Sequence, residues 1–162
     1  MEPIKKPRKA IVCIDLSQYE RYESGTIVGG IWIEINGTPF PEQRWVDFIG
    51  KLIAGWTWAT LDILHGTKRM ARYMFMDGPL YYSIRPISNN VWTIRCVRFG
   101  VTRHQTVLEC SIIPSIFCQS LLDSMISWLK YAVEQDPSYD LALFPQLRRD
   151  LEEAMTILSP TK

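Results

Sequence analysis

The chain has 162 residues, a formal net charge of +1, 47% apolar residues and 12% aromatic residues. This length suits one domain with one core, and the apolar content excludes disorder over most of the chain. No apolar run approaches the roughly 18 residues that cross a membrane, so no membrane-spanning helix is expected.

The ends of the chain set the expected domain limits. We expect a flexible basic N-terminus over residues 1–9, a single domain over residues 10–158 and a C-terminal tail over residues 159–162. The basic start is not followed by the apolar core of a signal peptide, so we expect a cytoplasmic protein.

The first predicted strand covers residues 10–16, and a polar connector that turns at Ser24-Gly25 follows it. Residues 29–35 alternate in polarity as a half-buried strand does, and Asn36-Gly37 is a strong turn signal. The next segment, "TPFPEQ", contains two prolines. Since proline cannot donate to a strand ladder, we expect a loop here and not the second arm of a hairpin.

A long helix is predicted from Arg44 to about Leu64, because apolar residues recur every third or fourth position from Trp45 to Ile63. Trp58 points about 200° away from Trp56 on such a helix. It therefore lies off the apolar stripe, together with Asp62 one turn later.

Four further strands are predicted, over residues 72–76, 80–87, 91–99 and 106–113. Pairing across the loop Ser88-Asn89-Asn90 places Ile84 opposite Ile94 and Tyr82 opposite Cys96. The face opposite the core then carries Tyr81, Ser83, Arg85, Thr93 and Arg95.

The C-terminal part predicts two helices. One starts at Pro114-Ser115, with Ser115 as its cap, and ends at Asp136-Pro137, and the other covers residues 144–158. The predicted fold is thus α+β, a single domain in which two to three helices pack on an antiparallel sheet of about five to six strands.

Motifs for enzyme chemistry are absent from the sequence, including GxGxxG, GxxxxGK[ST], HExxH and GxSxG. The carboxylates of Glu34, Asp47, Asp62 and Asp77 are candidates for acid–base work, but turn and helix-end roles explain Asp77 and Asp47 better. The two histidines, His65 and His104, have no motif around them. We therefore predict no catalytic residue, no metal site and no cofactor.

The four cysteines lie in apolar or alternating runs without a CxxC pair, so we interpret them as reduced core thiols.

Charge is distributed unevenly along the chain. Residues 51–110 contain eight Lys/Arg against three Asp/Glu, whereas residues 111–162 contain four against seven. The basic segment, with Tyr81 and Tyr82 among its arginines, leaves a nucleic-acid-binding module open as an alternative function. The low net charge makes nucleic acid an unlikely partner, and a small hydrolase is the weaker alternative.

Three stretches resemble small bacterial immunity proteins of polymorphic toxin systems: "GGIWIEINGTPFP" with "RWVDF", a Trp-containing helix with "IAGW", and "FMDGPLYYSI". The similarity covers Gly29 to Ile84, about a third of the chain. The helix departs from the family pattern, because "IGKLIAGWTWATL" stands where a more apolar, double-Trp version is expected.

The resemblance implies a single-domain protein, without catalysis or cofactor, that neutralises a cognate toxin by blocking its active site or substrate access. It supplies no binding residues, because the shared positions have the character of a scaffold. A basic toxin would favour the acidic segment with Glu134, Asp136 and Asp140, and an acidic toxin would favour Arg85 and Arg95. Trp58 and Asp62 are a further candidate contact, since an exposed Trp often anchors an interface.

Overall fold

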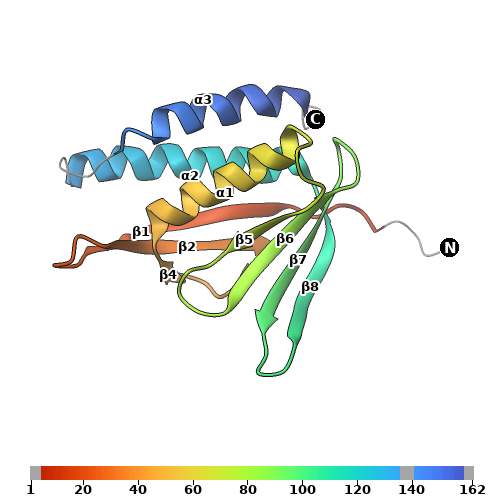
Figure 1. Ribbon diagram of the computed structural model, residues 1–162, viewed down its shortest axis with the longest axis horizontal. Helices are drawn as coiled ribbons and strands as arrows, with labels where there is room; N and C mark the ends of the chain where they lie inside the picture. The colour runs from red at the N-terminus through yellow and green to blue at the C-terminus, as the bar shows by residue number, and fades with distance from the viewer. Residues whose placement is uncertain (1–4, 136–140, 159–162) are drawn as a thin grey trace.

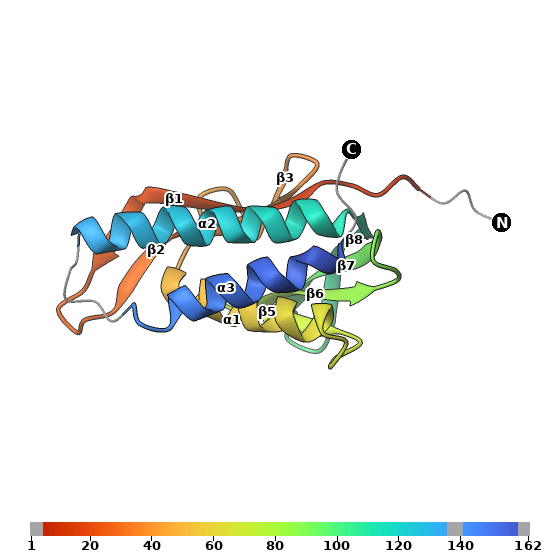
Figure 2. The ribbon, with the colours of Figure 1, turned by 90° about the horizontal axis from the view of Figure 1, so that it is seen from above.

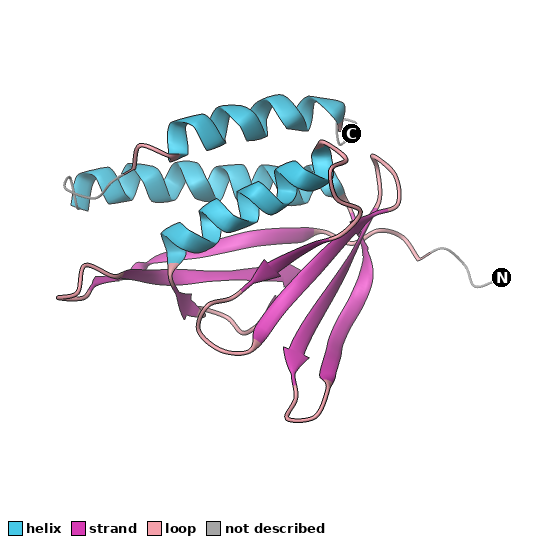
Figure 3. Ribbon diagram, in the orientation of Figure 1, coloured by secondary structure: helices cyan, strands magenta, loops and turns pink. Residues whose placement is uncertain are grey.

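The computed structural model describes residues 5–135 and 141–158. In this part of the chain, three α-helices lie on one side of two antiparallel sheets of four strands each (Figures 1 and 3). The α+β class and the antiparallel pairing are confirmed. The expected single sheet of five to six strands is instead two sheets, whose strands run in different directions.

The first sheet contains β1 (Ala10–Arg21), β2 (Ile27–Ile35), β3 (Thr38–Phe40) and β4 (Val46–Asp47). Its order is β1-β2-β3, with β4 also paired to β2. The second sheet contains β5 (Ala71–Met74), β6 (Leu80–Pro86), β7 (Trp92–Phe99) and β8 (His104–Ile112), in sequence order. The helices are α1 (Ile49–Leu64), α2 (Pro114–Gln135) and α3 (Phe144–Ala154), and a 3₁₀ turn over Met155–Ile157 follows α3.

Strand β1 is longer than predicted. It was expected to end at residue 16, but it continues to Arg21, which pairs with Ile27 after an irregularity between Asp15 and Glu20. Polar side chains are compatible with this extension because pairing uses backbone groups and one face of an antiparallel pair can be wet. The predicted turn at Ser24-Gly25 is present, with Gly25 at φ 86°.

The segment after Asn36-Gly37 is a hairpin arm, which corrects the prediction of a loop. Thr38 pairs with Ile35, Pro39 with Glu34 and Phe40 with Ile33. Hydrogen-bonded and non-hydrogen-bonded pairs alternate along such a ladder, so Pro39 occupies the position where no N–H is required. Proline therefore did not prevent pairing at this short edge strand.

Helix α1 begins at Ile49, five residues later than predicted. Val46 and Asp47 are instead extended and pair with Gly30 and Gly29 of β2. Trp45 fits the helical spacing by coincidence, since its ring packs edge-on against Phe75, with the ring centroids 6.3 Å apart. From Ile49 onward, the predicted apolar stripe is buried, apart from the half-buried Ala59.

The register predicted for β6 and β7 is confirmed, with Ile84 opposite Ile94 and Tyr82 opposite Cys96. The inner face of this sheet lies under the helices, where Tyr82 stacks on Tyr73 with a centroid distance of 4.6 Å. The Trp56 ring of α1 meets Tyr82 edge-on at 5.1 Å. Seen from above, the three helices lie side by side over the sheets (Figure 2).

The C-terminal elements differ little from the prediction. Helix α2 begins at Pro114, so Ser115 lies inside its first turn and not at the position before the helix. The predicted helix end at Asp136-Pro137 lies outside the described residues. Helix α3 begins at the predicted Phe144, where a proline follows at the second position.

The N-terminal segment joins the two sheets. Within the segment expected to be flexible, Arg8 donates its N–H to the Ser111 carbonyl at 2.8 Å and accepts from Ile113 at 3.1 Å. Arg8 thereby lies beside the end of β8 just before the chain enters β1. Arg8 and Lys9, at the end of this segment, are thus attached to the domain.

Candidate binding surface

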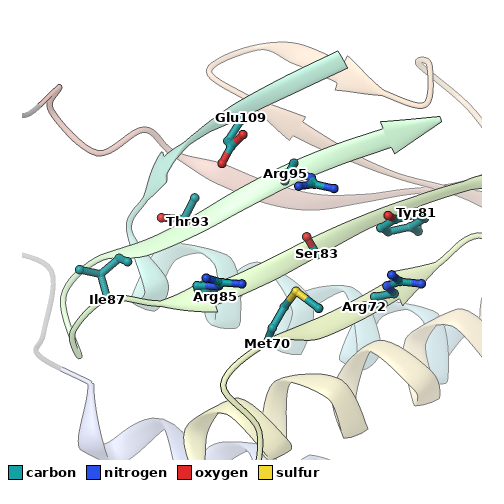
Figure 4. A pocket seen from close by; sticks show the side chains of 9 residues that line it. All are labelled: Met70, Arg72, Tyr81, Ser83, Arg85, Ile87, Thr93, Arg95 and Glu109. Atoms are coloured by element: carbon teal, nitrogen blue, oxygen red, sulfur yellow. The ribbon is translucent and has the colours of Figure 1, made fainter. Parts of the chain in front are cut away.

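The outer face of the second sheet is turned away from the helices. Strand pairing places Arg72, Ser83, Arg95 and Glu109 in one row across β5, β6, β7 and β8. Arg85 lies two residues beyond Ser83 on β6 and therefore on the same face. This face has a shallow hollow of about 430 Å³, in which the three arginines surround the shorter Ser83 (Figure 4). We call it the arginine hollow.

The arginines of the hollow are only weakly engaged. In the described parts of the chain, the guanidinium groups of Arg85 and Arg95 have no ion-pair or hydrogen-bond partner, although Glu109 lies directly across from Arg95. The Arg72 guanidinium lies over the Tyr81 ring, 4.9 Å from its centroid. Three positive groups and one carboxylate line the hollow. An anionic ligand would therefore find free guanidinium donors there.

Apolar side chains border the hollow. Met70 and Ile87 line it and are exposed by 39% and 66%, and Met74 lies next to Tyr81 on the edge strand β5 with 44% exposure. Exposed apolar side chains that gather at one place, and are not scattered singly, are typical of protein interaction sites. Methionine also adapts its shape to a partner. This border suits contact with another protein.

Tyr81 closes one end of the hollow but offers no free aromatic face. Its hydroxyl lies 3.2 Å from Nδ1 of His104, and its ring packs against Phe99 with the centroids 5.3 Å apart. Tyr81 is only 2% exposed, and Tyr82 points to the opposite face and is fully buried. The two tyrosines therefore do not form the base-stacking platform that the nucleic-acid alternative requires.

The other predicted contact residues lie elsewhere. Trp58, which is half exposed, and Asp62 are on α1, in the helix layer on the far side of the sheet from Arg85 and Arg95. Asp62 is paired with Lys68 at 3.1 Å, and this hydrogen-bonded ammonium lowers the pKa of Asp62. The structure therefore brings Arg85 and Arg95 together but separates them from Trp58 and Asp62.

The predicted acidic segment is only partly described. Glu134 is exposed near the end of α2, whereas Asp136 and Asp140 lie outside the described residues. On α3, Glu152 is paired with Arg148 at 2.9 Å, and Asp150 accepts a hydrogen bond from Gln146 at 2.7 Å. Part of the negative charge on α3 is thus engaged within the helix.

The candidate acid–base residues have structural partners. Asp47 is 1% exposed and accepts four N–H hydrogen bonds: from the Trp45 indole, Phe48, Met76 and Asp77. Glu34 accepts from the Trp32 indole at 3.3 Å. Within the described residues, no hydrogen bond joins two of the candidates Glu34, Asp77, His65 and His104, and no cluster of His, Cys, Asp or Glu suits a metal ion.

The four cysteines are unpaired thiols. Cys96 and Cys118 are buried, and Cys13 and Cys110 are half-buried. Burial raises the pKa of Cys96 to about 12. Desolvation also raises the pKa of Cys118. These two thiols are protonated at neutral pH and belong to the core.

Sequence reasoning missed Glu109 and left Arg72 out of the predicted contact set. A regular hairpin between β7 and β8 would place Leu108 opposite Arg95, but a register shift between Cys96 and Val97 places Glu109 there. One inserted residue exchanges the two faces of a strand, and no residue type signals it here. Arg72 was detectable, since its alternation with Ala71 and Tyr73 marks it as outward-facing.

A comparison of the chain with family models, curated proteins and solved structures finds no match. Among the helices of the described residues, none is long and apolar enough to cross a membrane.

Proposed function

We propose that this chain is an immunity protein that acts in the cytoplasm by binding a cognate protein toxin and blocking its active site or substrate access. The single observation that supports binding best is the arginine hollow. It is an open sheet face with free guanidinium groups and an apolar border, held in place by a packed core on its other side. The resemblance of residues 29–84 to immunity proteins supports a toxin as the partner.

The rigid support of the hollow favours a binding role. Its strands are held from behind by Tyr73, Tyr82 and Trp56, which are all buried. A preformed surface loses little conformational entropy when a partner binds, so a larger share of the contact energy becomes affinity. Trp58, Asp62 and Glu134 stay additional candidate contacts outside the hollow.

The shared motif fits a scaffold role in this proposal. A Cβ atom on Gly30 would lie 2.8 Å from the Cβ of Asp15, so the glycine allows β1 and β2 to approach closely. Asp47 fastens the start of α1 to the loop that contains Asp77. These residues maintain the fold, which leaves partner choice to exposed side chains such as Arg85 and Arg95.

The test begins with capture of partners by the tagged protein in its native cells, with washing at high salt and mass spectrometry of what is retained. A packed interface survives a wash that screens charges. The gene of the retained protein is then expressed in a host with and without this chain. We expect growth arrest by the partner alone and normal growth when both are present.

The opposite results would reject the proposal. These are a captured protein that does not harm the host, or toxicity that persists when this chain is present. Retention of nucleic acid at low salt alone would move the function to the nucleic-acid alternative.

A further inference from the structure

We infer that the arginine hollow binds an acidic, extended segment of a partner protein, with carboxylates at alternate positions facing Arg72, Arg85 and Arg95. This inference rests on the proposed function for the toxin as partner, but the chemistry of the segment follows from the hollow itself.

The distances between the three arginine positions are within reach of alternate side chains on an extended segment. Arg72 and Arg95 lie on either side of Ser83 in one cross-strand row, so their backbones are two strand spacings apart, roughly 10 Å. Arg85 is two residues from Ser83 along β6, roughly 7 Å, so its backbone is roughly 8–9 Å from those of Arg72 and Arg95, a difference that the long arginine side chains can span. In an extended segment, the side chains at positions i and i+2 point the same way and are also roughly 7 Å apart. Two such carboxylates can therefore meet different guanidinium groups of the hollow.

The charge of the hollow is available to a ligand. The guanidinium groups of Arg85 and Arg95 are exposed and have no partner in the described parts of the chain, and the Ser83 hydroxyl among the three arginines has none there either. Guanidinium groups bind carboxylates in a bidentate manner. Glu109, at one end of the row, leaves a net positive hollow and repels an anion at that end. A bound segment therefore covers the three arginines and does not extend across Glu109.

The surroundings favour protein carboxylates over nucleic-acid phosphates. The ring of Tyr81 is covered by the Arg72 guanidinium, so a base has no aromatic face on which to stack. Met70 and Ile87 border the hollow with exposed apolar surface. An acidic segment with apolar residues between its carboxylates would contact both the guanidinium groups of the hollow and the apolar side chains at its border.

The test is a titration of the ¹⁵N-labelled full chain, followed by NMR at low salt. The probe is the capped peptide Ac-GTEVEVEG-NH2. The matched control peptide has Gln in place of each Glu, and an oligothymidylate of similar charge represents nucleic acid. We expect the Glu peptide to shift amide signals of β5, β6 and β7 around Arg72, Ser83 and Arg95 in a saturable manner, and the Gln peptide to leave them unchanged.

Variants test whether the arginines carry the binding. The double variant Arg85→Gln/Arg95→Gln removes two exposed charges without a buried contact, so its circular dichroism spectrum should match that of the parent chain. We expect it to bind the Glu peptide roughly tenfold more weakly or worse. Arg148→Gln, on α3, is the matched control and should bind as the parent chain does.

Three results would overturn the inference: no shift with the Glu peptide, equal shifts with the Gln peptide, or unchanged affinity in the double variant. Stronger binding of the oligothymidylate at the same residues would assign the hollow to nucleic acid. The proposed function fails separately. If the double variant neutralises the toxin as well as the parent chain does, the immunity role stands and this inference is rejected. If the peptide binds but no toxin is captured, this inference stands and the immunity role is rejected.

Discussion

The Asp47 carboxylate connects three parts of the chain. Its Oδ2 atom accepts hydrogen bonds from the Trp45 indole at 3.1 Å, from the Met76 N–H at 3.0 Å and from the Asp77 N–H at 3.1 Å. Its Oδ1 atom accepts from the Phe48 N–H at 2.7 Å, at the start of α1. All four of these partners are N–H donors, so the position requires an acceptor-only side chain.

We expect Asp47→Asn to lower the free energy of unfolding by about 2–4 kcal/mol. The amide has one acceptor oxygen, and its NH₂ group would face one of the buried N–H donors. The loss is measured by urea unfolding, followed by tryptophan fluorescence.

Asp62→Asn is the matched control for this substitution. Its carboxylate lies on the surface of α1 and pairs with Lys68, so solvent screening limits the loss to about 0.5 kcal/mol or less. Equal losses in the two variants would contradict the structural role given to Asp47.

At the scale of elements, two glycine positions differ in whether their backbone conformation needs a glycine. Gly37 closes the β2–β3 hairpin with φ 83°, a conformation that an L side chain rarely adopts. Gly55 lies inside α1 on the exposed side, and a Cβ placed on it meets no atom within 4 Å. The first position needs glycine for its backbone, and the second does not.

We therefore expect Gly37→Ala to destabilise the protein by about 1 kcal/mol. Gly55→Ala should stabilise it by about 0.5–1 kcal/mol, because alanine loses less conformational entropy in a helix. Thermal unfolding by circular dichroism gives both values. A change of the same sign in both variants would show that backbone conformation does not decide the effect.

The sequence predicted elements well where periodicity and turn chemistry agree. The β6–β7 pair is an example, since a short polar loop and alternating Ile84, Tyr82 and Ile94 allow one register only. The predicted start of α1 was wrong because Trp45 fits a helical spacing, although its ring packs against Phe75, which is distant in the sequence. Arg85 and Arg95 were placed on one face by the same register. The full row was not predictable, since it depends on the register shift that puts Glu109 beside Arg95.

At the scale of the whole molecule, the core is rich in groups that can lose a proton at high pH. Burial raises the pKa of Tyr82 well above its ordinary value of 10.0 and that of Cys96 from 9.0 to about 12. Burial also raises the pKa of Tyr73 and of Cys118. All four groups lie between the helices and the second sheet or on the helices that cover it.

We expect the stability of the protein to fall as the pH rises above about 9. An unfolded chain releases these protons near the ordinary values, 9.0 for the thiols and 10.0 for the tyrosines, whereas the folded chain keeps them. The stabilisation is therefore complete below pH 9 and is lost as the pH rises toward the folded values. Once a group ionises in the unfolded chain, it lowers the free energy of unfolding by about 1.4 kcal/mol per pH unit. Urea unfolding at a series of alkaline pH values measures the slope.

Tyr82→Phe separates this linkage from general alkaline damage. The Tyr82 hydroxyl is buried without a hydrogen-bond partner in the described residues, so its removal should leave stability at pH 7 unchanged or slightly higher. Above pH 10 the variant should lose stability less steeply than the parent chain, by about 1.4 kcal/mol per pH unit. If the variant keeps the parent slope, Tyr82 does not hold its proton in the folded state and the tight closure of the core around it is wrong.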